Sequence, residues 1–275
     1  ACHCDPARPE LYCDACQERS AEGKLPQEEV PMCVVELPVS ATEDRVVGTL
    51  DIESAIRHGR KEFEAGILAE ANRSILYVDE INLLDDHIVD ILLDSAAMGV
   101  NTVEREGISY AHPARFVLVG TMNPEEGDIR PQLLDRFALS VTVTGEREAK
   151  DRIEVVKRRI AYEQDAEDFA ASYEGRQEAL REKIERARAL LKSVAVADRM
   201  LEKAAHISLA LGVDGHRADI TLIKAAMANA AFSGRTEVEK EDMKAVSRLV
   251  LAHRLRRRPF EEGEVDWSAV DDVLA

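Results

Sequence analysis

The stretch Ile75-Leu76-Tyr77-Val78-Asp79-Glu80 decides which fold this chain is expected to adopt. An uninterrupted apolar run leads directly into two adjacent carboxylates, which is the pattern of a strand buried within a parallel sheet. Open α/β sheets bind their ligands at the carboxyl ends of the strands, so we expect Asp79 and Glu80 at a binding edge. A core strand followed by a solvated acidic turn is the alternative that this short stretch leaves open.

Two polar groups farther along the chain have the chemistry that a phosphoryl-transfer site needs. A second apolar strand, 116–120, leads into Thr121-Met122-Asn123, and Arg136 follows at the end of a short helix. Adjacent acids can handle a magnesium ion and the attacking water, an amide can hold that water, and an arginine from a neighbouring subunit can neutralise the transition state. As alternatives, Asn123 before a proline is a common turn residue, and Arg136 is an ordinary surface or salt-bridged arginine.

The composition is that of a helix-rich globular protein with a strong negative charge. The 275 residues are enough for one large domain or two smaller ones. Only 4% of them are aromatic, so we expect mostly helix. The net charge of −17 repels phosphate groups, so we expect no partner among nucleic acids or membranes. Because no apolar stretch is long enough to cross a membrane and no signal peptide is visible, we expect a cytoplasmic protein.

The cysteines are concentrated at the beginning of the chain. Cys2 and Cys4 form one close pair and Cys13 and Cys16 another. Two pairs of thiols can supply the four ligands of a structural zinc ion. Reduced cysteines in a surface loop and redox-sensing disulfides are the other interpretations of this pattern.

Hydrophobic periodicity predicts an α/β core followed by helices. The expected core elements are a strand at 34–37, a loop at 40–50, helical faces at 52–59 and 63–71, a helix at 86–97 and a hairpin at 103–110. A short helix opened by Pro131 and an edge strand at 141–143 precede an almost wholly helical remainder. We divide the chain into a Cys-rich loop at 1–33, a core at 34–148, a long helical connection at 149–193 and a helical lid domain at 194–275.

Four stretches resemble the AAA+ ATPases and, among them, the ATPase subunits of magnesium chelatase. They are 41–45 (ATEDR), 75–86 (ILYVDEINLLDD), 101–115 (NTVEREGISYAHPAR) and 123–137 (NPEEGDIRPQLLDRF), with a weaker likeness at 255–262 (LRRRPFEE). The resemblance implies an α/β parallel-sheet core of the P-loop NTPase type, with an insertion at 42–72 and a hairpin at 101–113. An all-α lid domain follows that core.

The same resemblance implies roles for individual residues. Asp79 and Glu80 match the Walker B acids, Asn123 the sensor-1 residue and Arg136 the arginine finger, so these four are implied to be catalytic. Arg217 matches the sensor-2 arginine at the start of a lid helix and, with Asp79, is implied to bind the nucleotide and its magnesium ion. ATP and Mg²⁺ are the implied cofactors.

The resemblance also implies partners. The family forms homo-oligomeric rings, usually of six subunits, with ATP between neighbours. The ring drives metal insertion into a tetrapyrrole, together with an AAA+/integrin-like chelatase subunit and a large porphyrin-binding subunit. Magnesium and cobalt are both metals of close relatives. A MoxR-type metal-insertion chaperone and a non-catalytic interaction module derived from AAA+ proteins are the alternatives.

One motif of the family is missing from this sequence. The 275 residues contain no phosphate loop of the form G-x-x-x-x-G-K-[ST]. In the family, this loop and the first core strand precede the cysteine-bearing segment. We therefore expect a chain truncated at its N-terminus, whose sheet lacks its first strand.

Overall fold

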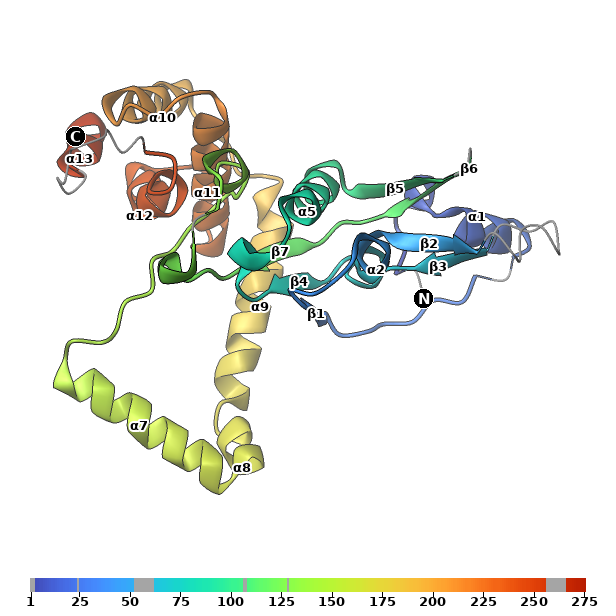
Figure 1. Ribbon diagram of the computed structural model, residues 1–275. Coiled ribbons are helices and arrows are strands. Elements are labelled where there is room, and N and C mark those ends of the chain that lie inside the picture. Colours follow the sequence, from blue (N-terminus) through green and yellow to red (C-terminus); the bar gives the residue numbers. More distant parts are fainter. Residues whose placement is uncertain (1–2, 24, 52–61, 106–107, 128, 256–265) are drawn as a thin grey trace. The chain divides into compact units, whose positions relative to one another are not determined.

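The computed structural model describes residues 3–23, 25–51, 62–105, 108–127, 129–255 and 266–275. The chain divides into two compact units, Ala1–Arg136 and Phe137–Ala275 (Figure 1). Within the described part of the chain, no helix is both long and apolar enough to cross a membrane.

The first unit is built on a parallel sheet in the order β1–β4–β7. Its strands are β1 (Val34–Leu37), β4 (Ile75–Val78) and β7 (Val117–Gly120). The strands pair without stagger, so that Leu37, Val78 and Gly120 lie at one level. This arrangement confirms the prediction of a parallel α/β core and places the ends of β4 and β7 side by side.

The alternation of side chains in the sheet explains why these apolar runs form strands. Val35, Leu37, Leu76 and Val78 are buried on one face of the sheet. Helix α5 (Asp86–Met98) packs against β7, and the predicted stop residue Gly99 ends it with a left-handed φ of 70°. The helix therefore covers part of the core beside β7, the neighbour of the strand that leads into Asp79 and Glu80.

Two antiparallel hairpins complete the first unit. The hairpin of β5 (Val100–Arg105) and β6 (Ile108–Pro113) is longer than the 103–110 expected from alternation and agrees with the 101–113 that the resemblance implies. The second hairpin joins β2 (Gly48–Asp51) to β3 (Glu62–Ala65), and helices α2 (Glu43–Val47) and α4 (Ile67–Glu70) lie on either side of it in sequence. The N-terminal segment carries a short turn, Pro9–Leu11, and α1 (Asp14–Ala21).

The structure corrects two predictions for the stretch 40–71. The expected loop at 40–50 is helix α2 followed by strand β2, because Glu43 and Asp44 favour the first turn of a helix and β2 finds a partner in β3. The expected helical face at 63–71 is a strand up to Ala65 and a helix only from Ile67. The helix expected at 52–59 lies outside the described residues.

The second unit is helical, as predicted. Its helices are α7 (Ala149–Gln164), α8 (Ala166–Ala171), α9 (Glu174–Leu191), α10 (Asp198–Ala210), α11 (Arg217–Phe232), α12 (Lys240–Leu251) and α13 (Ser268–Leu274). Its core includes Ile207, Leu222, Met243 and Val250. The unit also takes in α7, none of whose side chains is buried.

The edge strand predicted at 141–143 is wrong. These residues adopt no strand conformation, and Val143 is 89% exposed. Their β-branched side chains favour an extended backbone, but a strand also needs a neighbour to accept its hydrogen bonds. Nearby, Ser140 instead donates its backbone N–H to the carbonyl of Leu249 in α12.

Candidate functional site

The candidate site lies at the carboxyl ends of β4 and β7. The pairing of Val78 with Gly120 continues one step past the strands, because the backbone N–H of Thr121 donates to the carbonyl of Val78. The N–H of Ile81 then donates to the carbonyl of Thr121 at 2.9 Å. These bonds hold the residues after the two strands next to each other, where ligands of α/β sheets bind.

Asp79 is the centre of this arrangement. Its Oδ1 atom accepts a hydrogen bond of 2.6 Å from the hydroxyl of Thr121 and one of 2.9 Å from the hydroxyl of Tyr77. These two bonds, that from Thr121 being the stronger influence, lower the pKa of Asp79 below its ordinary value. The side chain is therefore an exposed, oriented carboxylate, which is the type of ligand that Mg²⁺ prefers.

Glu80 has a different environment, although it is the next residue. Its backbone is left-handed (φ 53°, ψ 52°), and its N–H donates to the hydroxyl oxygen of Thr121 at 3.0 Å. The negative charge of Glu126, followed by burial and the charge of Asp79, raises the pKa of Glu80. Two adjacent carboxyl groups thus have pKa values shifted in opposite directions, which is common where they have different chemical roles.

Sequence reasoning missed Tyr77 and Thr121 as members of the site. Tyr77 lies two residues before Asp79, so the period of a strand places both side chains on one face. Thr121 follows β7 directly, as Asp79 follows β4. The sequence contains both spacings, but only the register between β4 and β7 shows that these side chains meet at Asp79.

Asn123 begins a short turn, Pro124–Glu126. Its Oδ1 atom accepts the backbone N–H of Glu125 at 3.2 Å, so the side chain caps this turn. This is the turn role considered above as the alternative for Asn-Pro. The amide NH₂ group is not used by that bond, and the role of Asn123 in holding water stays a prediction.

Arg136 lies just beyond α6 (Pro131–Leu134) and forms ion pairs with helix α5. Its Nη1 atom is 2.7 Å from Oδ1 of Asp94 and 3.3 Å from Oδ1 of Asp90. Salt-bridged arginine was the alternative considered for this residue, and the structure shows such pairs. They fix where the guanidinium lies on the first unit and leave its action on a neighbouring subunit as a prediction.

Arg217 is the first residue of α11 in the second unit. Its side chain is exposed, as a sensor at the start of a lid helix must be to reach a nucleotide. It belongs to a different compact unit from Asp79, and its part in nucleotide binding also stays a prediction.

The structure brings together the predicted cysteines that it describes. The Sγ atoms of Cys4, Cys13 and Cys16 lie within 4.8 Å of one another. Cys2, the remaining predicted metal ligand, lies outside the described residues.

Comparison with known proteins adds an independent line of observation. The family model of the AAA domain (dynein-related subfamily) matches residues 26–137, and that of the AAA lid domain matches residues 201–273. A magnesium-chelatase subunit ChlI homolog from Methanocaldococcus jannaschii is 51% identical over 272 residues, which cover 99% of this chain and 74% of that protein.

Two further comparisons agree with this result. Magnesium-chelatase subunit ChlI from Anabaena variabilis is 50% identical over 272 residues, covering 98% of this chain and 80% of that protein. A solved structure of an ATPase candidate from Cytophaga hutchinsonii is 18% identical, with a TM-score of 0.61, and covers 88% of this chain and 76% of that one. The last likeness concerns the fold alone.

Proposed function

The chain belongs to the AAA family of ATPases and, within it, to the magnesium-chelatase ATPase subunits, and from this premise we propose how its residues work. The protein is the ATP-hydrolysing motor subunit of a chelatase that inserts magnesium or cobalt into a tetrapyrrole. The observation that carries the proposal is the pair Asp79 and Glu80, held at the carboxyl edge of the sheet with pKa values shifted in opposite directions.

Asp79 is proposed to hold the magnesium ion that accompanies ATP. Thr121 and Tyr77 occupy its Oδ1 atom, so they fix the carboxylate while its second oxygen is not used by these bonds. A Mg²⁺ ligand must be charged, and the lowered pKa of Asp79 extends its charged form to more acidic conditions than usual. When bound, the ion neutralises charge on the phosphates during phosphoryl transfer.

Glu80 is proposed to orient the water that attacks the γ-phosphate and to accept its proton. A base works best when its pKa approaches the working pH, and the shift of Glu80 is in that direction. Glu80 has a left-handed backbone conformation. A strained backbone conformation at a non-glycine residue is most often kept where function needs it.

Asn123, Arg136 and Arg217 are proposed to complete the site around the nucleotide. The NH₂ group of Asn123 would hold the water, and Arg217 would contact the phosphates from the lid. Arg136 would act on the nucleotide of the adjacent subunit in a homo-oligomeric ring, which we propose to be a hexamer. Asp90 and Asp94 support that role because they hold the guanidinium on a helix rather than on a loose loop.

The partners follow from the family. Both curated relatives described above are named as subunits of magnesium chelatase, so the proposed motor works on other chelatase subunits rather than on the tetrapyrrole itself. We propose an AAA+/integrin-like subunit and a large porphyrin-binding subunit, in the cytoplasm.

The decisive experiment replaces Glu80 by Gln in the protein. ATP turnover should fall at least about 100-fold while nucleotide binding persists, because Gln keeps the shape and removes the base. Glu70→Gln, an equally small change at an exposed position on α4, is the matched control and should leave turnover unchanged. Turnover at the original rate in the Glu80 variant would refute the proposal.

A further inference from the structure

A cluster of cysteine side chains lies in the N-terminal segment, apart from the proposed ATPase site. The Sγ atoms of Cys4, Cys13 and Cys16 are all within 4.8 Å of one another. Tetrahedral zinc has Zn–S bonds of about 2.3 Å, which places its sulfur ligands roughly 3.8 Å apart. Small side-chain rotations therefore suffice to bring these thiols onto one ion.

The local backbone places N–H groups next to the cysteine cluster. Cys13 precedes the first residue of α1 and Cys16 lies in its first turn, so both thiols are close to the positive end of the helix dipole. The backbone N–H of Cys13 also points at Sγ of Cys4, at 3.5 Å.

Among the described residues of the N-terminal segment, the apolar cluster is small. Tyr12, Cys13 and Cys16 are buried there, with Cys4 and Leu25 packed against them. Cys13 and Cys16 are only 2% and 8% exposed. Segments this short seldom fold on apolar burial alone and usually depend on a metal, a disulfide or a partner surface.

We propose that Cys4, Cys13 and Cys16 bind a structural Zn²⁺ ion. Each thiol gives up its proton as its Zn–S bond forms, so metal loading at constant pH releases protons. A soft, redox-inert ion with a preference for several thiolates fits this donor set better than magnesium, which requires oxygen ligands. Cys2, which the cysteine pattern predicts as a further ligand, lies outside the described residues.

The structure also indicates what the zinc ion holds in place. The Nδ2 atom of Asn72 donates to the carbonyl of His3 at 3.0 Å, and its Oδ1 atom accepts the backbone N–H of Arg115 at 3.0 Å. Asn72 is only 1% exposed and lies just before β4, and Arg115 lies just before β7. One buried side chain thus joins the segment that contains Cys4 to the beginnings of both strands.

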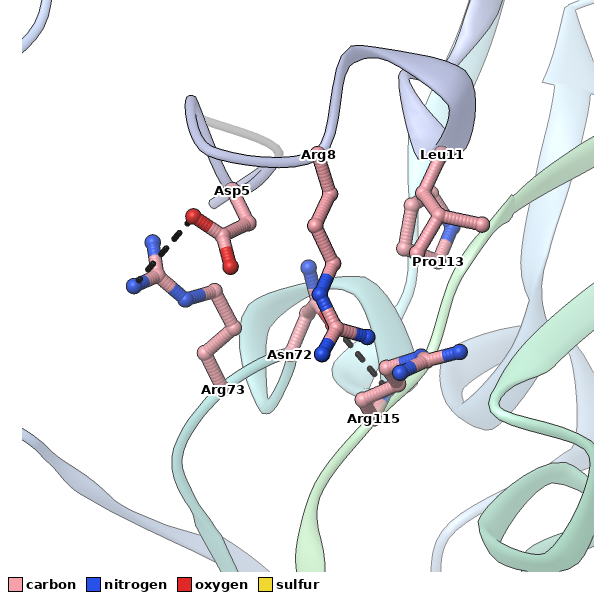
Figure 2. Close-up of a pocket in the computed structure, with 7 residues that line it drawn as sticks. All are labelled: Asp5, Arg8, Leu11, Asn72, Arg73, Pro113 and Arg115. Carbon is pink, nitrogen blue, oxygen red and sulfur yellow. Dashed lines mark hydrogen bonds and ion pairs between the residues drawn. The ribbon is translucent and has the colours of Figure 1, made fainter. Parts of the chain in front are cut away.

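Figure 2 shows the cavity at this junction. It has a volume of about 140 Å³, and Asp5, Arg8 and Leu11 face it from the N-terminal segment. The residues that line it from the core are Asn72, Arg73, Pro113 and Arg115. The cavity lies at the opposite ends of β4 and β7 from Asp79, so the zinc ion has a structural task that is separate from ATP hydrolysis.

Metal analysis of the intact protein, purified without added metal and washed with a weak chelator, tests the proposal. We expect about one zinc ion per chain, and a loss of that zinc in the Cys13→Ser and Cys16→Ser variants. Cys33→Ser is the matched control and should keep its zinc, because Cys33 is exposed and outside the cluster. Zinc-free protein that is fully folded would overturn the proposal, as would an intact mass lower by the two hydrogens of a disulfide.

A second measurement keeps the test valid if the cysteine variants do not fold. Zinc is removed from the unchanged protein and replaced by Co²⁺, whose thiolate charge-transfer absorption should appear and should disappear when zinc is returned. Loss of zinc should also reduce hydrogen-exchange protection of the Arg115 amide, which Asn72 accepts. Absence of the cobalt signal, or unchanged protection, would contradict the proposal whether or not the protein hydrolyses ATP.

Discussion

The hydroxyl of Thr121 donates a hydrogen bond of 2.6 Å to the carboxylate of Asp79 and accepts one of 3.0 Å from the backbone N–H of Glu80. One side chain at the end of β7 thus fixes both acids at the end of β4. The hydroxyl is also the strongest cause of the lowered pKa of Asp79. Thr121 therefore deserves a test alongside the acids themselves.

Thr121→Val should impair ATP hydrolysis without unfolding the protein. The change keeps the shape of the side chain but removes the hydrogen bond to Asp79 and leaves the N–H of Glu80 without its acceptor. Loss of such a supporting bond typically costs about 10- to 100-fold in metal affinity or activity. Turnover measured against Mg²⁺ concentration should show a higher magnesium requirement, and Thr121→Ser should restore most of the activity. Equal activity of the Val and Ser variants would show that the hydroxyl is not needed.

Mixed rings should reveal whether Arg136 acts across a subunit boundary. An Arg136→Ala subunit keeps Glu80, and a Glu80→Gln subunit keeps Arg136, so mixing two inactive proteins creates some boundaries with both residues. We expect ATP turnover to reappear in the mixture, at a fraction of the original rate. Each variant alone, at the same total protein concentration, is the control. A mixture as inactive as its components would place Arg136 in its own subunit's site or in a purely structural role with Asp94.

The ion pair between the half-buried Arg235 and the buried Asp242 should be the main electrostatic support of the second unit. Asp242 is fully buried, its two oxygens accept bonds from Arg235 at 2.6 and 2.7 Å, and Asn229 and the N–H of Glu239 add two more. Asp242→Ala leaves the guanidinium only its exposed pair with Glu239 and should lower the free energy of unfolding by about 3 kcal/mol. Fluorescence of Trp267, the single tryptophan of the chain, reports on this unit. Glu239→Gln, at the exposed rim, should cost under about 1 kcal/mol.

The same pair predicts how stability depends on pH. Burial alone would raise the pKa of Asp242, but bonds from Arg235, the Glu239 amide and Asn229 outweigh it and leave the pKa below its ordinary value. A carboxyl group with a lower pKa in the folded state stabilises the fold above its unfolded pKa of about 3.9 and loses that contribution in stronger acid. The stability difference between the original protein and Asp242→Asn should therefore be constant near neutrality and shrink below about pH 4. A difference that persists in strong acid would mean that the charge of Asp242 is not what matters.

A pair of glycines offers a test of packing in the first unit. A Cβ atom on Gly66 would lie 2.5 Å from the carbonyl oxygen of Val46 and against the backbone N of Gly48, neither of which can move easily. Gly66→Ala should therefore destabilise the first unit by about 1–3 kcal/mol. Gly175→Ala, in α9 and facing open space, should instead gain up to about 1 kcal/mol. The midpoints of thermal unfolding of both variants are compared. Equal midpoints would show that the backbone at 46–48 shifts to make room for the added Cβ atom.

The parts of the fold that local patterns predicted are those whose signal is contained in one element. β4, β7 and α5 follow from an apolar run or from a helical period with a glycine stop. Whether residues 48–51 and 141–143 form strands depends on a partner strand, which no local sequence pattern reveals. Residues 48–51 found one in β3. Residues 141–143 formed no strand, although their sequence favours an extended backbone.

The candidate site shows the same limit. Asp79 and Glu80 are visible in the sequence because two acids directly follow an apolar run. Thr121 gains its role only when the sheet brings it next to Asp79, and Tyr77 only when both point to one face. The ion pairs of Arg136 with α5 depend on tertiary structure and could not be predicted from the spacing of residues.

The flush alignment of β4 with β7 also determines where this chain can change in length. Val78 lies opposite Gly120, and each strand has only four residues. A single residue inserted within β7 would turn Thr121 to the other face of the sheet and remove it from Asp79. Insertions for labelling, splitting or fusing the protein therefore have to avoid both strands, and natural length variation in relatives should be confined to the connections between them.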